Sequence, residues 1–183
     1  MRRRRIRSLS LGKRGSSGSA AVEFALIAPA FFLLLFASFE TGLTYFAGMT
    51  LENGVVESAR LIRTGQTHNA GMSQAQFRND LCDRVNMLLS CDAGKLYIDV
   101  RSFSNFGGSS YPPALDEDGE LNPDLNSFQT GSSGAATNGS PIVLVRVFYK
   151  WQLFTPIFAQ YFKNMPDNVR LISSSVAFRN EPF

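Results

Sequence analysis

The sequence has few of the side chains that carry catalysis. Among its 183 residues it contains one histidine, His68, and two cysteines, Cys82 and Cys91. Nucleophilic catalysis needs an activated Ser, Thr or Cys beside a base, and a metal site needs several His, Cys, Asp or Glu ligands at suitable spacings. The sequence shows neither arrangement, and it has no glycine-rich phosphate loop between a strand and a helix. We therefore predict that the protein is not an enzyme and has no metal or other cofactor.

Negative charge is absent from the first 22 residues, and positive charge is concentrated there. Residues 1–18 contain seven of the 18 Lys and Arg residues and none of the 15 acids, which leaves 11 basic and 15 acidic groups in residues 19–183. The whole chain is formally +3, whereas residues 19–183 are −4. Nucleic-acid-binding domains usually spread positive charge over a folded face, so we predict no nucleic-acid partner, the alternative being a disordered basic arm that binds one. Basic residues beside an apolar run instead indicate the cytoplasmic side of a membrane.

Charge of either sign is also absent from residues 24–39. The stretch 20–39 reads AAVEFALIAPAFFLLLFASF and contains one charged residue, Glu23. About 20 helical residues cross a hydrocarbon core of about 30 Å, and the weakly polar residues after Glu40 lengthen the run. We therefore predict a membrane helix over residues 19–47, in contact with lipid. A cleaved signal peptide is the alternative, although the small residues that its cleavage site requires are poorly placed here.

Apolar residues continue beyond this span at intervals of three or four. This spacing predicts that the helix extends over residues 48–64 with one apolar stripe. The stripe consists of Leu43, Ala47, Leu51, Val55, Ala59 and Ile62.

Residues 65–183 have the pattern of an α+β domain. A second helix is expected to begin at Ser73, because Ser73 and Gln76 can form a capping box. Its apolar face contains Phe77, Leu81, Val85, Leu88 and Leu89. Alternating apolar residues predict three strands, over 95–103, 142–151 and 169–178, with a short aromatic helix between the last two.

The stretch 104–141 differs from its surroundings because it is rich in Gly, Ser, Pro, Asn and Asp. This composition predicts a long flexible loop between two strands. The strands are expected to form a small antiparallel sheet that buries one face against the amphipathic part of the first helix. The predicted fold is therefore α+β, with a long N-terminal helix, a second helix and a small sheet.

The two cysteines lie close together in the sequence, nine residues apart. Outside the cytoplasm, two thiols in one small domain usually pair. A bridge from Cys82 to Cys91 would pin the end of the second helix, and loop closure of this length stabilises by about 2–3 kcal/mol. Half of a metal site is the alternative, but His68 is distant in sequence.

The junction between the basic segment and the apolar run has a recognisable pattern. Gly18 is followed by Glu23 at the fifth position and then by Phe24, and these residues open the apolar helix. The pattern resembles a type IV prepilin processing site, and more closely the TadE-like pseudopilins of tight-adherence (Flp) pilus systems. Further matches are Pro29, Glu-Thr-Gly at 40–42, Glu-Ser-Ala-Arg at 57–60 and Arg-Asn-Glu-Pro-Phe at 179–183.

The resemblance implies that a prepilin peptidase cuts between Gly18 and Ser19 and removes a basic leader, residues 1–18. A cut after Gly15 would place Glu23 at position eight instead of position five. In pilins the new α-amino group pairs with the glutamate at position five of a neighbouring subunit. Glu23 and Phe24 would thus form a processing and assembly motif.

The role that the resemblance implies is that of a minor pseudopilin, which helps to initiate, cap or assemble the Flp pilus by helix packing. Its expected partners are other pilin or pseudopilin subunits, the tight-adherence inner-membrane platform, the prepilin peptidase and membrane lipid. The expected location is the bacterial inner membrane, with a single pass, a cytoplasmic N-terminus and a periplasmic C-terminal domain, or the pilus itself. The sequence leaves open an unprocessed, membrane-anchored periplasmic scaffold or binding protein, and a secreted protein with a conventional signal peptide.

Overall fold

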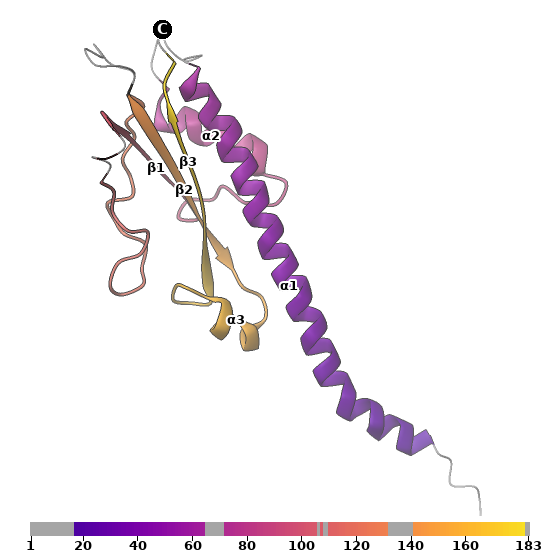
Figure 1. Ribbon diagram of the computed structural model, residues 1–183. Coiled ribbons are helices and arrows are strands. Elements are labelled where there is room, and N and C mark those ends of the chain that lie inside the picture. The colour runs from indigo at the N-terminus through magenta and orange to yellow at the C-terminus, as the bar shows by residue number, and fades with distance from the viewer. Residues whose placement is uncertain (1–16, 65–71, 106, 108–109, 132–140, 182–183) are drawn as a thin grey trace, which may run out of the picture. The chain divides into compact units, whose positions relative to one another are not determined.

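The computed structural model describes residues 17–64, 72–105, 107, 110–131 and 141–181. The elements follow one another as α1 (Ser17–Arg63), α2 (Gln74–Val85), β1 (Leu96–Phe103), β2 (Ile142–Gln152), α3 (Pro156–Phe162) and β3 (Val169–Arg179) (Figure 1). The chain divides after Ala37 into two compact units, of which the second contains the rest of α1 and every other element. This arrangement confirms the predicted α+β class, including the long N-terminal helix and the second helix.

The three strands form one antiparallel sheet in the order β1-β2-β3. Each strand lies within one or two residues of its predicted range, because alternating burial defines the strands clearly in the sequence. The helix α1 has 47 residues and begins two residues before the expected start at Ser19. Helix ends are poorly defined by sequence, since the first turn lacks internal hydrogen-bond partners.

One face of the sheet packs against the second half of α1 and against α2 (Figure 1). The helix α1 contributes a buried stripe at the spacing that the sequence predicts, and β2 contributes the alternate residues of its inner face. The buried residues of these two elements are Ala47, Leu51, Val55, Ala59, Ile62, Val143, Val145, Val147, Tyr149 and Trp151. Leu43 was predicted to join the stripe but is 42% exposed, and the buried apolar stripe begins one turn later, at Ala47.

The second helix begins as predicted. The Ser73 side chain accepts the backbone N–H of Gln76, and the Gln76 side chain accepts the backbone N–H of Ser73. This capping box satisfies donors that the first turn leaves unpaired. The apolar face of α2 lies in the core, with Phe77, Leu81 and Val85 buried. The helix ends at Val85, so Leu88 and Leu89, which were predicted on this face, lie in the turn after it, where Leu89 is buried and Leu88 partly buried.

The other face of the sheet is also covered, which the sequence did not predict. The segment 110–131 lies along this face (Figure 1), and its Leu125 joins Phe148, Met165 and Leu171 in a second buried cluster. Ser127 and Gln129 bond to the backbone of Val100 and extend the edge of the sheet. Residues 110–131 belong to none of the helices and strands, in keeping with the loop predicted over 104–141. Their packing on the sheet was not predicted, because apolar residues dispersed in a polar sequence find a shared surface only in the folded chain.

A buried ion pair lies beneath this segment. The Asp99 carboxylate is fully buried and accepts hydrogen bonds from the Arg146 Nε at 3.1 Å, the Arg101 Nε at 3.1 Å and the Ser127 N–H at 3.2 Å. Arg146 also donates to the Pro112 carbonyl oxygen at 2.8 Å. Carboxylates and guanidinium groups are rarely buried unless they are paired, and here each has several partners. The pair therefore ties the covering segment to β1 and β2.

Several predicted segments lie outside the described residues. These are the basic leader up to residue 16, the stretch 65–71 with His68, and the part of the 104–141 stretch from 132 to 140.

The helix α1 lies close to α2 at Gly54. A Cβ atom added there would lie 2.5 Å from the Val85 Cγ1 and 3.1 Å from the Leu81 Cδ1. At Gly48, six residues earlier on α1, the added Cβ would meet the Ile172 Cγ2 at an ordinary 3.8 Å. Gly54 thus allows the two helices to approach closely, whereas Gly48 does not serve this purpose.

We expect Gly54→Ala to destabilise the protein and Gly48→Ala to stabilise it. Both substitutions gain about 1 kcal/mol of helix propensity. At Gly54 this gain is outweighed by overpacking against a stiff β-branched side chain, which costs about 1–3 kcal/mol. Thermal unfolding of the full chain in detergent, followed by the fluorescence of its single tryptophan, would measure the difference. Equal stabilisation by both substitutions would contradict this account of the α1–α2 contact.

Candidate functional site

The N-terminal part of α1 is apolar on every side and exposed. Among the described residues, α1 is the one helix that is long and apolar enough to cross a membrane, and none of its most apolar stretch is buried. The exposed large side chains of this part include Val22, Phe24, Leu26, Ile27, Phe31, Phe32, Leu34 and Phe36. A soluble helix hides at least one apolar face, so this composition fits a single-pass membrane anchor.

The predicted cleavage site, Gly18 and Ser19, and the predicted motif, Glu23 and Phe24, lie in the first two turns of α1. The Ser19 hydroxyl donates to the Glu23 Oε1 at 3.1 Å, one helical turn along. Phe24 is 68% exposed, and a Cβ atom added to Gly18 would meet no atom within 4 Å. Packing within the chain therefore does not require a glycine at position 18, although glycine costs about 1 kcal/mol relative to alanine inside a helix.

Glu23 and Glu40 are the only acids between residue 19 and residue 51, and their surroundings differ sharply. Glu40 is 7% exposed, and its carboxylate accepts the backbone N–H groups of Phe154 and Thr155, which lead into α3. Thr155 is the N-cap residue of α3, and its own side chain makes no capping bond. Glu40, a residue of α1, thus caps the start of α3. The positive end of the α3 dipole also stabilises a negative charge at this position.

The capping role of Glu40 was missed in the sequence, although a signal for it was present. An acid within a predicted membrane span is costly, which suggests that it has a partner. The sequence could not identify that partner, because Phe154 and Thr155 follow Glu40 by more than 110 positions.

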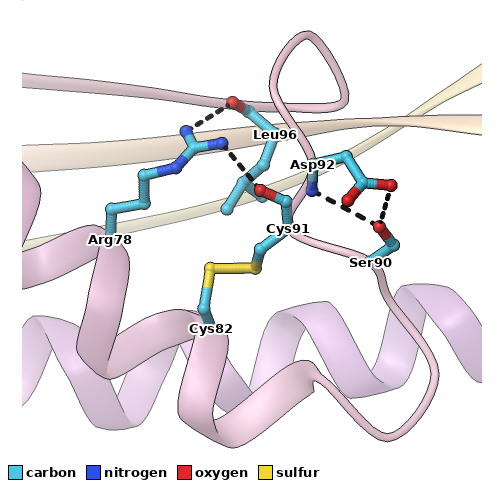
Figure 2. The surroundings of a disulfide bond; sticks show 6 residues. All are labelled: Arg78, Cys82, Ser90, Cys91, Asp92 and Leu96. Carbon is cyan, nitrogen blue, oxygen red and sulfur yellow. Dashed lines mark hydrogen bonds between the residues drawn. A yellow bond between two sulfur atoms is a disulfide. The ribbon is translucent and has the colours of Figure 1, made fainter.

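The predicted disulfide between Cys82 and Cys91 is present, and it connects α2 to the segment before β1 (Figure 2). Beside it, Arg78 donates to the carbonyl oxygens of Leu96 at 2.9 Å and of Cys91 at 3.2 Å. The Gln74 side chain donates to the carbonyl oxygen of Ile98 at 3.3 Å. The bridge and these two side chains together hold α2 against the outer edge of β1.

Two carboxyl groups near this disulfide, those of Asp80 and Asp92, have lowered pKa values. The Arg84 side chain, one turn along α2, lowers the pKa of Asp80 through a hydrogen bond and its charge. The Ser90 hydroxyl and then the Lys95 ammonium lower the pKa of Asp92. Both are explained by local structural contacts, and no group of three or more His, Cys, Asp and Glu residues in the described part of the chain could hold a metal ion.

We expect Glu40→Ala to loosen the start of α3 without affecting the sheet. Hydrogen bonds to a charged group contribute about 1.5–3 kcal/mol each, so the amides of Phe154 and Thr155 should exchange hydrogen much faster in the variant. Hydrogen-exchange mass spectrometry of the full chain in detergent would measure this. Glu52→Ala is the matched control, because Glu52 is exposed on the same helix. Unchanged exchange at residues 154–155 in Glu40→Ala would refute the capping role.

The comparisons with known proteins bear on the same segment. Residues 18–60 match the family described as TadE-like protein. No curated protein and no solved structure matches the chain. The match begins at Gly18 and includes Glu23, Phe24 and Glu40. Residues 18–60 are thus similar to the TadE-like family, as the N-terminal pattern predicts.

Proposed function

We propose that the protein is a minor pseudopilin that helps to initiate, cap or assemble the tight-adherence Flp pilus. A prepilin peptidase cuts it between Gly18 and Ser19, and the mature helix then packs against the helices of other pilin-like subunits. The protein acts without catalysis of its own. It sits in the inner membrane, with residues 1–18 in the cytoplasm before cleavage and the domain 65–183 in the periplasm.

The observation that carries the proposal is the contrast between the two acids of the apolar helix. The charge of Glu40 is stabilised by two backbone N–H groups of its own domain. Glu23 has the hydroxyl of Ser19 as its partner among the described residues, and it is exposed on a helix that is otherwise apolar. A carboxylate in an apolar setting is tolerable when it is paired with a cation, so Glu23 favours a partner outside this chain.

Cleavage after Gly18 would create a suitable cation. The new α-amino group of Ser19 would lie four residues, or about one helical turn, before Glu23 in its own chain. In a bundle of parallel helices, the amine of one subunit can reach the carboxylate of a neighbour that is shifted along the bundle axis. The pair would therefore specify the axial shift between subunits.

Glycine at position 18 also suits recognition by a peptidase. The bond between Gly18 and Ser19 lies in the first turn of α1, where backbone donors lack partners within the helix. A protease must reach this bond in an extended conformation, and glycine lowers the cost of unwinding the turn. Recognition by the peptidase would therefore explain the glycine at position 18, which packing among the described residues does not explain.

The alternative function is that of an unprocessed, single-pass scaffold or binding protein in the periplasm. The ordered domain, with its disulfide and two packed faces, is compatible with that role. It differs from the proposal in keeping residues 1–18, and this difference can be measured directly.

We expect the protein purified from membranes to begin at Ser19, and we expect Gly18→Ala to block this cleavage. The substitution adds a methyl group at the cleaved position and so removes the glycine that, by the resemblance, the peptidase recognises. N-terminal sequencing and intact mass would identify the first residue. Gly15→Ala is the matched control, because it alters the nearest alternative glycine and should leave the Ser19 start unchanged. A mature protein that retains Met1 would favour the unprocessed anchor.

We expect Glu23→Gln to abolish or strongly reduce piliation while the membrane level of the protein and its cleavage stay normal. Glutamine keeps the shape of the side chain but cannot form an ion pair with the new amine. Glu52→Gln, on the exposed surface of the same helix, should have no effect. Piliation counts by electron microscopy and immunoblots of membrane fractions would provide the two readouts. Normal pili with Glu23→Gln would show that the ion pair does not direct assembly.

A further inference from the structure

The short helix α3 exposes an unusual amount of apolar surface for its length. It has seven residues, of which Ala159 is buried. Of the large apolar side chains in and just before it, Tyr161 is 77% exposed, Phe154 67% and Ile157 56%. Ile157 and Tyr161 are four positions apart and share one face of α3, and Phe154 lies two residues before the helix begins. This face points away from the core that Ala159 joins.

Glu40 determines where this apolar face lies. Its carboxylate binds the backbone of Phe154 and Thr155, so the start of α3 lies beside residue 40 of α1. Residue 40 belongs to the span predicted over residues 19–47. The part of the span that lies in the second unit, 38–47, also exposes Phe39, Leu43, Tyr45 and Phe46. Glu40 therefore holds α3, with its exposed apolar side chains, beside a part of α1 that also exposes apolar side chains.

The charges around α3 favour lipid over another protein as the partner. From Trp151 to Pro166 the chain has no acid, and its one charged residue is Lys163 at the end of the helix. Aromatic residues are enriched at the boundary between hydrocarbon and head groups, and a lysine there can extend its ammonium toward phosphate while its stem stays in apolar surroundings. A contact between copies of a mildly acidic domain would more often include complementary charges.

We propose that α3 is a second membrane contact, which inserts Phe154, Ile157 and Tyr161 into the head-group region of the leaflet that α1 leaves on its way into the domain. Glu40 holds this contact beside α1, and its carboxylate is compensated by the backbone of the segment that it positions. The domain then touches the bilayer at two points and cannot rotate freely about α1. The proposal requires that α1 spans the membrane, but it does not depend on cleavage or on pilus assembly.

The test uses the full chain in phospholipid vesicles with an environment-sensitive fluorophore at one introduced cysteine. The native disulfide stays intact, so the introduced thiol alone is labelled. The probe position is Ile157→Cys. Phe31→Cys, in the apolar run, is the control for lipid contact. Ser104→Cys, beyond the end of β1 and at the opposite end of the sheet from α3, is the control for water.

We expect the fluorophore at position 157 to show blue-shifted emission and several-fold stronger quenching by nitroxide-labelled lipids than the fluorophore at position 104. Quenching of the probe at 157 by aqueous iodide to the level seen at 104 would overturn the proposal. Protection from both quenchers, with disulfide cross-linking between copies of Ile157→Cys, would assign this face to a second copy and equally overturn it. A water-exposed probe at position 31 would instead show that α1 itself does not insert.

Discussion

Burial of one stripe of α1 against the sheet is the interaction on which the rest of the domain depends. The stripe from Ala47 to Ile62 covers the inner face of β2 and also forms the floor on which α2 packs. Each fully buried Leu or Val side chain contributes about 1.5–3 kcal/mol, so these few residues supply much of the stability of a small domain. The same helix continues toward the N-terminus without any buried stripe. The protein covers a single apolar stripe of α1 in its C-terminal part. The N-terminal part of α1 is apolar on all sides, where lipid is expected to cover it.

The two acids on this helix illustrate how surroundings decide the role of a charged residue. Glu23 and Glu40 are chemically identical, and each interrupts an apolar sequence. Two backbone N–H groups and the end of a short helix satisfy Glu40, which makes it a structural residue. A single serine hydroxyl is the described partner of Glu23. This sparse compensation of Glu23 is the contrast on which the proposed assembly role rests.

Much of the fold could be predicted because it depends on local patterns. The capping box at Ser73, the alternation in β2 and the stripe of α1 all repeat within a few residues, and each appears in the structure close to its predicted place. The disulfide was also predictable, because two cysteines in one small domain leave a single pairing. Local patterns thus identified the elements and their inner faces.

The contacts that sequence could not predict join residues that are distant in the chain. Asp99 and Arg146 are directly opposite in the register of β1 and β2, but that register is known only once the strands have paired. The covering segment 110–131 has too few apolar residues for periodicity to reveal it, and its Leu125 becomes a core residue only against Phe148. Glu40 and Phe154 are similarly separated. Gly18 was identified by resemblance, since no packing contact among the described residues requires a glycine there.

The outer edge of β1 limits how copies of this protein could associate. An exposed strand edge offers free carbonyl and N–H groups to any passing strand, which is a common route to polymerisation. Here the Arg78 and Gln74 side chains occupy the carbonyls of Leu96 and Ile98, and the segment around Phe128 pairs with Val100. A second chain could not extend the sheet at this edge without first displacing the protein's own groups. Strand addition at the β1 edge of the sheet is therefore blocked by the protein's own side chains and by the segment 110–131.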